Sequence, residues 1–283
     1  MTPGMPVRRL PLRRRSHALA ILLLSLLCLW PAPPARAVIG GEEMRMEFMM
    51  TRYVVGIRYE DESGAKKICA GAIIGPSIVL TAAHCIPRDR STMSVVFGDS
   101  MRPDRAVAEL AVAGVRVHEK YEFIKDLPLP DSNDLAVIRT KDPLPSAARH
   151  MQLAASLFPV SQIPTVYVAG YGAIGVGRDG KAVGQGQLHS AIAHRAADKD
   201  RMYEQNLMIV VDQSKGTGIC IGDGGAPMLV ENKEGFILMG IASVIFVADN
   251  GSNPCGGTTA FVNVHAFEEW IIQQAFELMQ VYK

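Results

Sequence analysis

The segment Cys220–Pro227 constrains this chain most, because its eight residues carry almost no side-chain bulk. It reads Cys-Ile-Gly-Asp-Gly-Gly-Ala-Pro, and Asp223 is its one charged residue. A loop of this kind has little to pack into a core, so its use lies in its backbone N–H groups and in that single carboxylate. The segment therefore indicates a functional loop.

The charge of the chain is unevenly distributed. Of 283 residues, 48% are hydrophobic, which is enough for one large domain or two small ones. Residues 1–37 contain six arginines and no acid, so 23 of the 29 basic residues remain against 28 acidic ones, a net charge of −5 for the rest. A mildly acidic body gives no reason to expect nucleic acid or an anionic membrane as a partner.

Residues 1–37 have the pattern of a secretory signal peptide. An arginine-rich start precedes an apolar run over residues 18–30, and Ala35-Arg36-Ala37 follows as a cleavage signal. Thirteen residues are too few for a helix that crosses a bilayer, which needs about 20. We expect cleavage near Ala37, a secreted or periplasmic protein, and no stable membrane insertion afterwards; an uncleaved membrane anchor is the alternative.

Cysteine usage agrees with export. Five cysteines become four once Cys28 leaves with the signal, and an even number in an exported chain suggests two disulfides. A zinc site is the competing interpretation, but no Cys-x-x-Cys or paired histidine spacing accompanies these cysteines. We expect no metal and no cofactor, because the glycines at 170–177 also lack the helix and the Lys-Ser/Thr of a phosphate-binding loop.

Short β-type segments separated by turns fill most of the chain. Strands are expected over residues 52–60, 68–83 (interrupted by Gly75-Pro76), 93–97, 106–118, 135–138, 165–172, 236–246 and 259–264. Apolar residues at helical spacing over 267–279 predict a terminal amphipathic helix. Residues 172–186 hold six glycines and suggest a mobile loop, and residues 187–217 give no clear pattern. Many short strands and one helix favour an all-β fold with two packed barrels.

Two further segments carry polar residues at strand ends. Thr81-Ala82-Ala83-His84-Cys85 places a histidine between small residues, where it is poorly suited to core packing. Asp134 directly precedes the apolar run at 135–138, which is rich in Val and Ile and favours a strand; taken alone, this acid could be a helix cap or a turn residue. His118 has no such motif and is expected on the surface or in a turn.

Together these segments resemble the chymotrypsin/trypsin-type serine proteases (peptidase S1). Residues 81–85 match the family's histidine motif at every position, residues 133–138 resemble the segment of its orienting acid, and residues 220–227 resemble its loop Cys-x-Gly-Asp-Ser-Gly-Gly-Pro. The resemblance extends over residues 38–280 and includes two cysteine pairs, Cys69 with Cys85 and Cys220 with Cys255. It implies a trypsin-like domain over residues 38–283, with two six-stranded Greek-key barrels at 38–148 and 149–283, the second carrying the C-terminal helix.

The resemblance also implies roles for individual residues. His84 is the general base, Asp134 orients it, and Gly224 stands at the nucleophile position, where the family has serine. The oxyanion hole maps to the N–H groups of Gly222 and Gly224. The substrate pocket maps to Gly218 at its floor and to Ser243, Ile245 and Thr259 at its walls. A new N-terminus at Val38 would form an ion pair with Asp223.

Glycine has no hydroxyl group, so the first hypothesis is a protease homologue that does not cleave and instead binds peptide or protein. His84 is then expected to face a water in the space left by the missing side chain. The alternative is an active endopeptidase that uses another hydroxyl, such as that of Ser243 or Thr217, or an activated water. A third hypothesis is a structural protein that keeps only the fold.

Overall fold

The computed structural model describes residues 45–122, 133–154, 165–177, 181–196, 207–214, 218–246 and 255–281. The predicted signal peptide (residues 1–37), Val38 and Thr217 lie outside these residues. None of the helices within them is both long and apolar enough to span a membrane.

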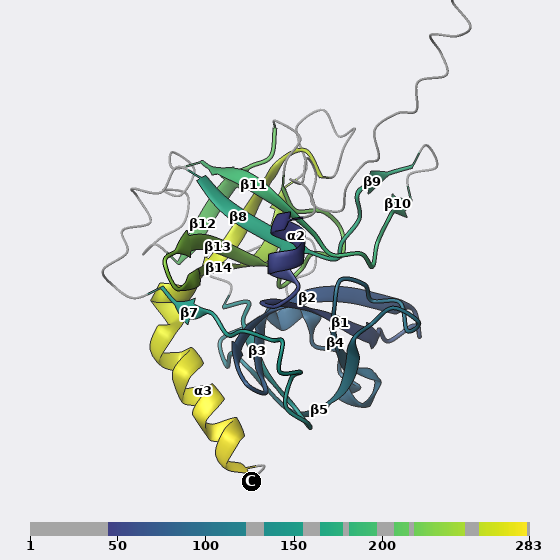
Figure 1. Cartoon of the computed structure of the whole chain (residues 1–283), viewed down its shortest axis with the longest axis vertical. Coiled ribbons are helices and arrows are strands. Elements are labelled where there is room, and N and C mark those ends of the chain that lie inside the picture. The colour runs from purple at the N-terminus through teal and green to yellow at the C-terminus, as the bar shows by residue number, and fades with distance from the viewer. Residues whose placement is uncertain are drawn as a thin grey trace, which may run out of the picture. The chain divides into compact units, whose positions relative to one another are not determined.

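Within the described residues, six strands of the first half close into an antiparallel barrel (Figure 1). Their order around the barrel is β1-β2-β3-β6-β5-β4, closed by pairing of β1 with β4. The strands are β1 (Val54–Glu60), β2 (Lys66–Gly75), β3 (Ile78–Thr81), β4 (Ser94–Phe97), β5 (Ala108–Val117) and β6 (Ala136–Thr140). Buried aliphatic side chains such as those of Ile57, Leu80 and Ile138 fill its interior.

The strands of the second half also close into an antiparallel barrel. Its described strands are β8 (Thr165–Gly170), β11 (His189–Arg195), β12 (Met208–Asp212), β13 (Pro227–Asn232), β14 (Gly235–Phe246) and β15 (Thr258–Asn263). They run in the order β13-β8-β11-β12-β15-β14, and β13 pairs with β14 to close the ring. A short strand β7 (Gln152–Leu153) adds to β14 in parallel. The prediction of an all-β fold with two six-stranded barrels and a C-terminal helix is confirmed.

The C-terminal helix α3 (Glu268–Val281) packs on the first barrel. Ile271 and Leu278 are its buried side chains, and the Arg139 guanidinium of β6 donates to the Leu278 carbonyl at 3.3 Å. His118 is buried against the rings of Phe267 and Trp270, with ring centroids 5.3 and 4.7 Å away. His118 was expected on the surface or in a turn. It begins a turn, since its carbonyl accepts from Tyr121 N at 2.9 Å, but it is buried and not on the surface, because residues from the far end of the chain cover it.

Three segments differ from the sequence-based expectation. The glycine-rich segment 172–186 contains a two-stranded pair, β9 (Gly175–Val176) with β10 (Ala182–Val183). β11 and β12 lie in the stretch that gave no pattern; β11 consists mainly of small or polar residues with weak β propensity, and its neighbours β8 and β12 define it. A short helix α2 (Arg45–Met50) precedes β1, where none was expected.

Candidate active site

The pairing of β3 with β6 brings the histidine and its acid together. Thr81 at the end of β3 pairs with Ala136 at the start of β6. His84 follows Thr81 by three residues in a short 3-10 turn, and Asp134 precedes Ala136 by two. Two residues 50 positions apart in the sequence therefore meet at one end of the first barrel.

Asp134 holds His84 through two hydrogen bonds. Its Oδ2 lies 2.7 Å from the imidazole Nδ1, and its Oδ1 accepts from the backbone N–H of His84 at 2.9 Å. The Asp134 side chain is buried at 5% exposure, whereas that of His84 is 30% exposed. The carboxylate fixes the ring orientation and favours a proton on Nδ1. This leaves Nε2 as a proton acceptor that faces the loop Cys220–Pro227, called the glycine loop below.

Burial and charge act in opposite directions on this pair. Burial alone lowers the pKa of His84, but the charge and hydrogen bond of Asp134 outweigh it, so the pKa stands above its usual value. Burial raises the pKa of Asp134, yet His84, together with hydrogen bonds from Ser243 and from the His84 backbone, holds that pKa below its usual value. The two groups therefore favour the ionised pair.

Ser243 from β14 completes this group. Its hydroxyl donates to Asp134 Oδ2 at 2.6 Å. The residue was expected as a pocket wall, and it also lines the cavity described below. Because its hydrogen bond goes to the acid and not to the histidine, the second barrel helps to position the acid of the first.

The glycine loop passes directly in front of His84. Gly224 accepts a hydrogen bond from Ala70 N at 2.8 Å, and the Gly225 N–H donates to the Ala242 carbonyl at 2.9 Å. A Cβ placed on Gly225 would collide with Thr81 and Ala70, and its φ of +76° lies in the left-handed region. Glycine at 225 therefore lets the loop run close to the first barrel.

The space beside Gly224 is occupied by the histidine ring itself. A Cβ built on Gly224 would overlap His84 Nε2 and lie 3.3 Å from Cys69 Sγ. The expected free space at the position of a Cβ on residue 224 is absent, because the imidazole overlaps that position. Among the described residues, Nε2 has no hydrogen-bond partner.

The two backbone donors assigned to an oxyanion hole flank Asp223. Gly222 has a φ of +96°, which suits glycine. Within the described part of the chain, the N–H groups of Gly222 and Gly224 donate to no acceptor, whereas those of Asp223, Gly225 and Ala226 are all used inside the fold.

Asp223 points away from this site into the second barrel. It is fully buried and accepts from Gly172 N at 2.6 Å and from Cys220 N at 3.0 Å. No cation of the described residues forms an ion pair with it. Burial therefore raises its pKa to about 7.

A cavity of about 190 Å³ opens beside His84 and the glycine loop. The expected wall residues Ser243, Ile245 and Thr259 line it, whereas Gly218 does not. The full lining consists of His84, Ile219, Cys220, Ile221, Gly222, Gly224, Ala242, Ser243, Val244, Ile245 and Thr259. Branched side chains dominate the walls, so the cavity has room for a small side chain.

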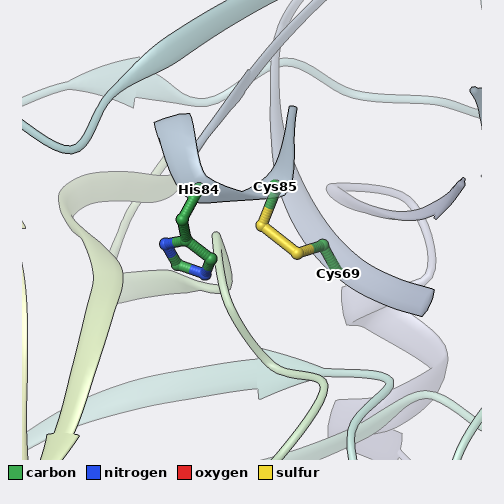
Figure 2. Close-up of side chains that lie close together, drawn as sticks. All are labelled: Cys69, His84 and Cys85. Carbon is green, nitrogen blue, oxygen red and sulfur yellow. A yellow bond between two sulfur atoms is a disulfide. The ribbon is translucent and has the colours of Figure 1, made fainter. Parts of the chain in front are cut away.

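Both expected disulfides are present, Cys69–Cys85 and Cys220–Cys255. Figure 2 shows His84 next to the Cys69–Cys85 bridge. The donor atoms of Cys69, His84 and Cys85 lie within 4.8 Å of one another, which resembles a metal-ligand cluster. Metals bind the thiolate form of cysteine, and these two sulfurs are bonded to each other, so this trio is not a metal site.

A family model described as Trypsin matches residues 38–271. The chain belongs to the trypsin family. Chymotrypsin-C of Rattus norvegicus is 27% identical over 265 residues, covering 89% of this chain and 95% of that protein. Trypsin eta of Drosophila erecta is 25% identical over 266 residues, with the same coverage. Ovochymase of Halocynthia roretzi is 27% identical over 220 residues, but the match spans 13% of that longer protein.

A solved structure supports the fold of this trypsin-family chain. The structure titled "Structure of GrC" aligns with a TM-score of 0.64 at 24% identity and covers 83% of this chain and 98% of that one. At this identity the match shows the fold alone: two barrels of the trypsin-like type.

Sequence reasoning missed one buried polar residue of this trypsin-family site. Gln213, at the end of β12, is fully buried and forms hydrogen bonds with Ile219 and Thr259, two residues that line the cavity. The signal available was a lone amide after an apolar strand, in a stretch with no readable pattern.

Proposed function

We propose that this chain is a proteolytically inactive member of the trypsin family in which Gly224 replaces the nucleophilic serine. The observation that carries the proposal is the position of Gly224 against His84 Nε2, where a nucleophile would have to sit and where no hydroxyl exists. Without it, no acyl-enzyme can form. A comparable triad that loses this group loses about a millionfold in turnover.

The proposed activity is the binding of a peptide or protein. Two backbone N–H groups without acceptors and a cavity beside His84 support it, because both would serve a docked peptide even when it is not cut. The family acts on peptides and proteins, which gives the chemical class of the partner. A structural protein that keeps only the fold would bind no peptide.

The competing function is an active endopeptidase that uses a substitute nucleophile or a water activated by His84. The ionised His84–Asp134 pair favours it, because a general base is in place. The hydroxyl of Ser243 does not fit the role of nucleophile, because it donates to Asp134 and not to His84.

The decisive experiment exposes the purified protein to a fluorophosphonate probe and, separately, to a mixed library of blocked peptides. We expect no covalent label, no cleavage, and retention of a subset of peptides. Labelling or cleavage that His84→Ala abolishes would establish an active enzyme. If no peptide is retained, the proposed binding is wrong, and the hypothesis of a structural protein that keeps only the fold is favoured.

We further propose that residues 1–37 are removed during export and that the mature domain begins at Val38. The two disulfides support an oxidising destination, secreted or periplasmic. The α-ammonium of Val38 is then the partner of Asp223. An ion pair there would explain why a carboxylate with only two backbone donors is tolerated in the core.

A further inference from the structure

Gln213 is held by four side-chain hydrogen bonds. Its Nε2 donates to the carbonyls of Ile219 and Cys255 at 2.9 and 3.1 Å. Its Oε1 accepts from the Ile219 N–H at 2.7 Å and from the Thr259 hydroxyl at 2.6 Å. The amide thus uses both donor hydrogens and both acceptor positions, which fixes its place.

This amide is bonded to two residues of the cavity wall. Ile219 and Thr259 line the cavity, and both are bonded to Gln213, which does not line it. A Cβ added to Gly218 would overlap the carboxamide of Gln213, and the φ of Gly218, +151°, also disfavours a side chain. Glycine at 218 is therefore required by the position of Gln213.

We propose that Gln213 forms the closed floor of the cavity and restricts the peptide side chain bound there to a small one, such as that of alanine. This assignment rests on the proposed peptide binding. A long side chain could enter only by displacing the amide. The N–H of Ile219 and the carbonyls of Ile219 and Cys255 would then lose their partners, which is costly in a buried site.

The test compares two blocked peptides, acetyl-Ala-Ala-Ala-Ala-amide and acetyl-Ala-Ala-Ala-Phe-amide, by calorimetric titration of the full chain. We expect wild type to prefer the alanine peptide by at least about tenfold, as for a side chain that does not fit a closed pocket. Gln213→Ala removes the floor and is expected to reduce or reverse that preference. If the alanine variant does not fold, Gln213→Asn replaces it. This variant keeps an amide but is shorter, and it is also expected to reduce the preference for the alanine peptide.

Two controls separate the floor from general damage. Gln213→Met keeps the space filled and is expected to keep the preference for alanine. Gln152→Ala removes a surface amide bonded to Glu234 and is expected to behave as wild type. A wild type that prefers the phenylalanine peptide, or a preference unchanged in both shortened variants, would overturn the proposal.

A second measurement does not depend on peptide binding. Phenol has an apolar ring and a hydroxyl that can pair with the groups Gln213 leaves behind, so it is expected to shift the Ile219 amide resonance in Gln213→Ala and not in wild type. If neither wild type nor any variant binds either peptide, the proposed function fails. The phenol experiment then decides alone whether Gln213 closes the floor of the cavity. Equal phenol shifts in both proteins would refute a closed floor.

Discussion

His84 Nε2 lies in the space that a Cβ on Gly224 would occupy. The φ of Gly224 is outside the left-handed region, so its backbone accepts any residue. What stands in the way of a side chain is the end of the imidazole, a side chain that is 30% exposed, and not backbone. A side chain at position 224 is therefore blocked mainly by the side chain of His84 and not by the backbone conformation of the loop.

Gly224→Ser is expected to restore peptidase activity. The new hydroxyl would face Nε2 once the ring shifts, and the Asp134–His84 pair is already formed. We expect the rate of peptide hydrolysis to rise at least about a thousandfold above wild type, since removing this hydroxyl from a comparable triad lowers turnover about a millionfold. A fluorophosphonate should also label position 224.

Gly224→Ala is the matched control, because it adds the same Cβ and moves the same ring without adding a hydroxyl. It is expected to remain inactive. If Gly224→Ser folds but is as inactive as Gly224→Ala, other parts of the site besides position 224 are unable to support catalysis.

The stability of the protein is expected to depend on pH through Asp223. Its folded-state pKa of about 7 is above the usual 3.8, so the folded state binds a proton that the unfolded state has lost. Stability should therefore fall as pH rises from about 4 to 7, by up to about 1.4 kcal/mol per pH unit.

This pH dependence is expected only where Asp223 has no cation. Melting temperatures measured between pH 4.5 and 7.5 should fall for protein that keeps residues 1–37 and stay level or rise for protein that begins at Val38. Asp223→Asn should flatten the first curve. Identical curves for the two N-terminal forms would contradict an ion pair between Val38 and Asp223.

Ser243→Ala is expected to destabilise the protein by about 2 kcal/mol, because it removes a hydrogen bond to a buried carboxylate. Ser94→Ala is the matched control, since Ser94 also donates to a carboxylate at 2.6 Å, that of Glu109, but at the surface. Its cost should be below about 1 kcal/mol. Urea denaturation measures both, and equal values would argue against a positioning role for Ser243.

Asp134→Asn is expected to lower the pKa of His84 below its usual value. The charge that raises this pKa disappears, while burial, which lowers it, remains. Titration of the imidazole proton resonances by NMR measures the change, with His118, whose pKa burial lowers, as an internal reference. An unchanged His84 pKa would show that the pair is not electrostatically coupled.

The sign of the His84 contribution to stability follows from the same shift. Because its folded-state pKa is raised, protonated His84 stabilises the fold below about pH 6.5, and this contribution disappears as pH rises through the folded-state pKa. Asp134→Asn should remove this contribution, which denaturation at pH 5.5 and pH 8 can detect.

Local sequence signals determined most of the framework. Short β-type runs separated by turns predicted the strands of the first barrel, and the His84 and Cys220–Pro227 motifs predicted where the candidate site lies. These signals are readable because strand propensity, turn residues and small-residue motifs act over a few neighbouring positions. β11 was not readable, since its small residues become a strand only between β8 and β12.

The amino-acid sequence by itself determined that residue 224 is a glycine, which has no hydroxyl, and no folding can supply one. Only the tertiary structure decided that His84 lies against Gly224, that Ser243 donates to Asp134, and that Gln213 is bonded to two residues that line the cavity. The physical reason is separation along the chain: Ser243 is 109 residues from Asp134, and Thr259 is 46 from Gln213. Contacts between such distant residues depend on how the two barrels close, which no local pattern encodes.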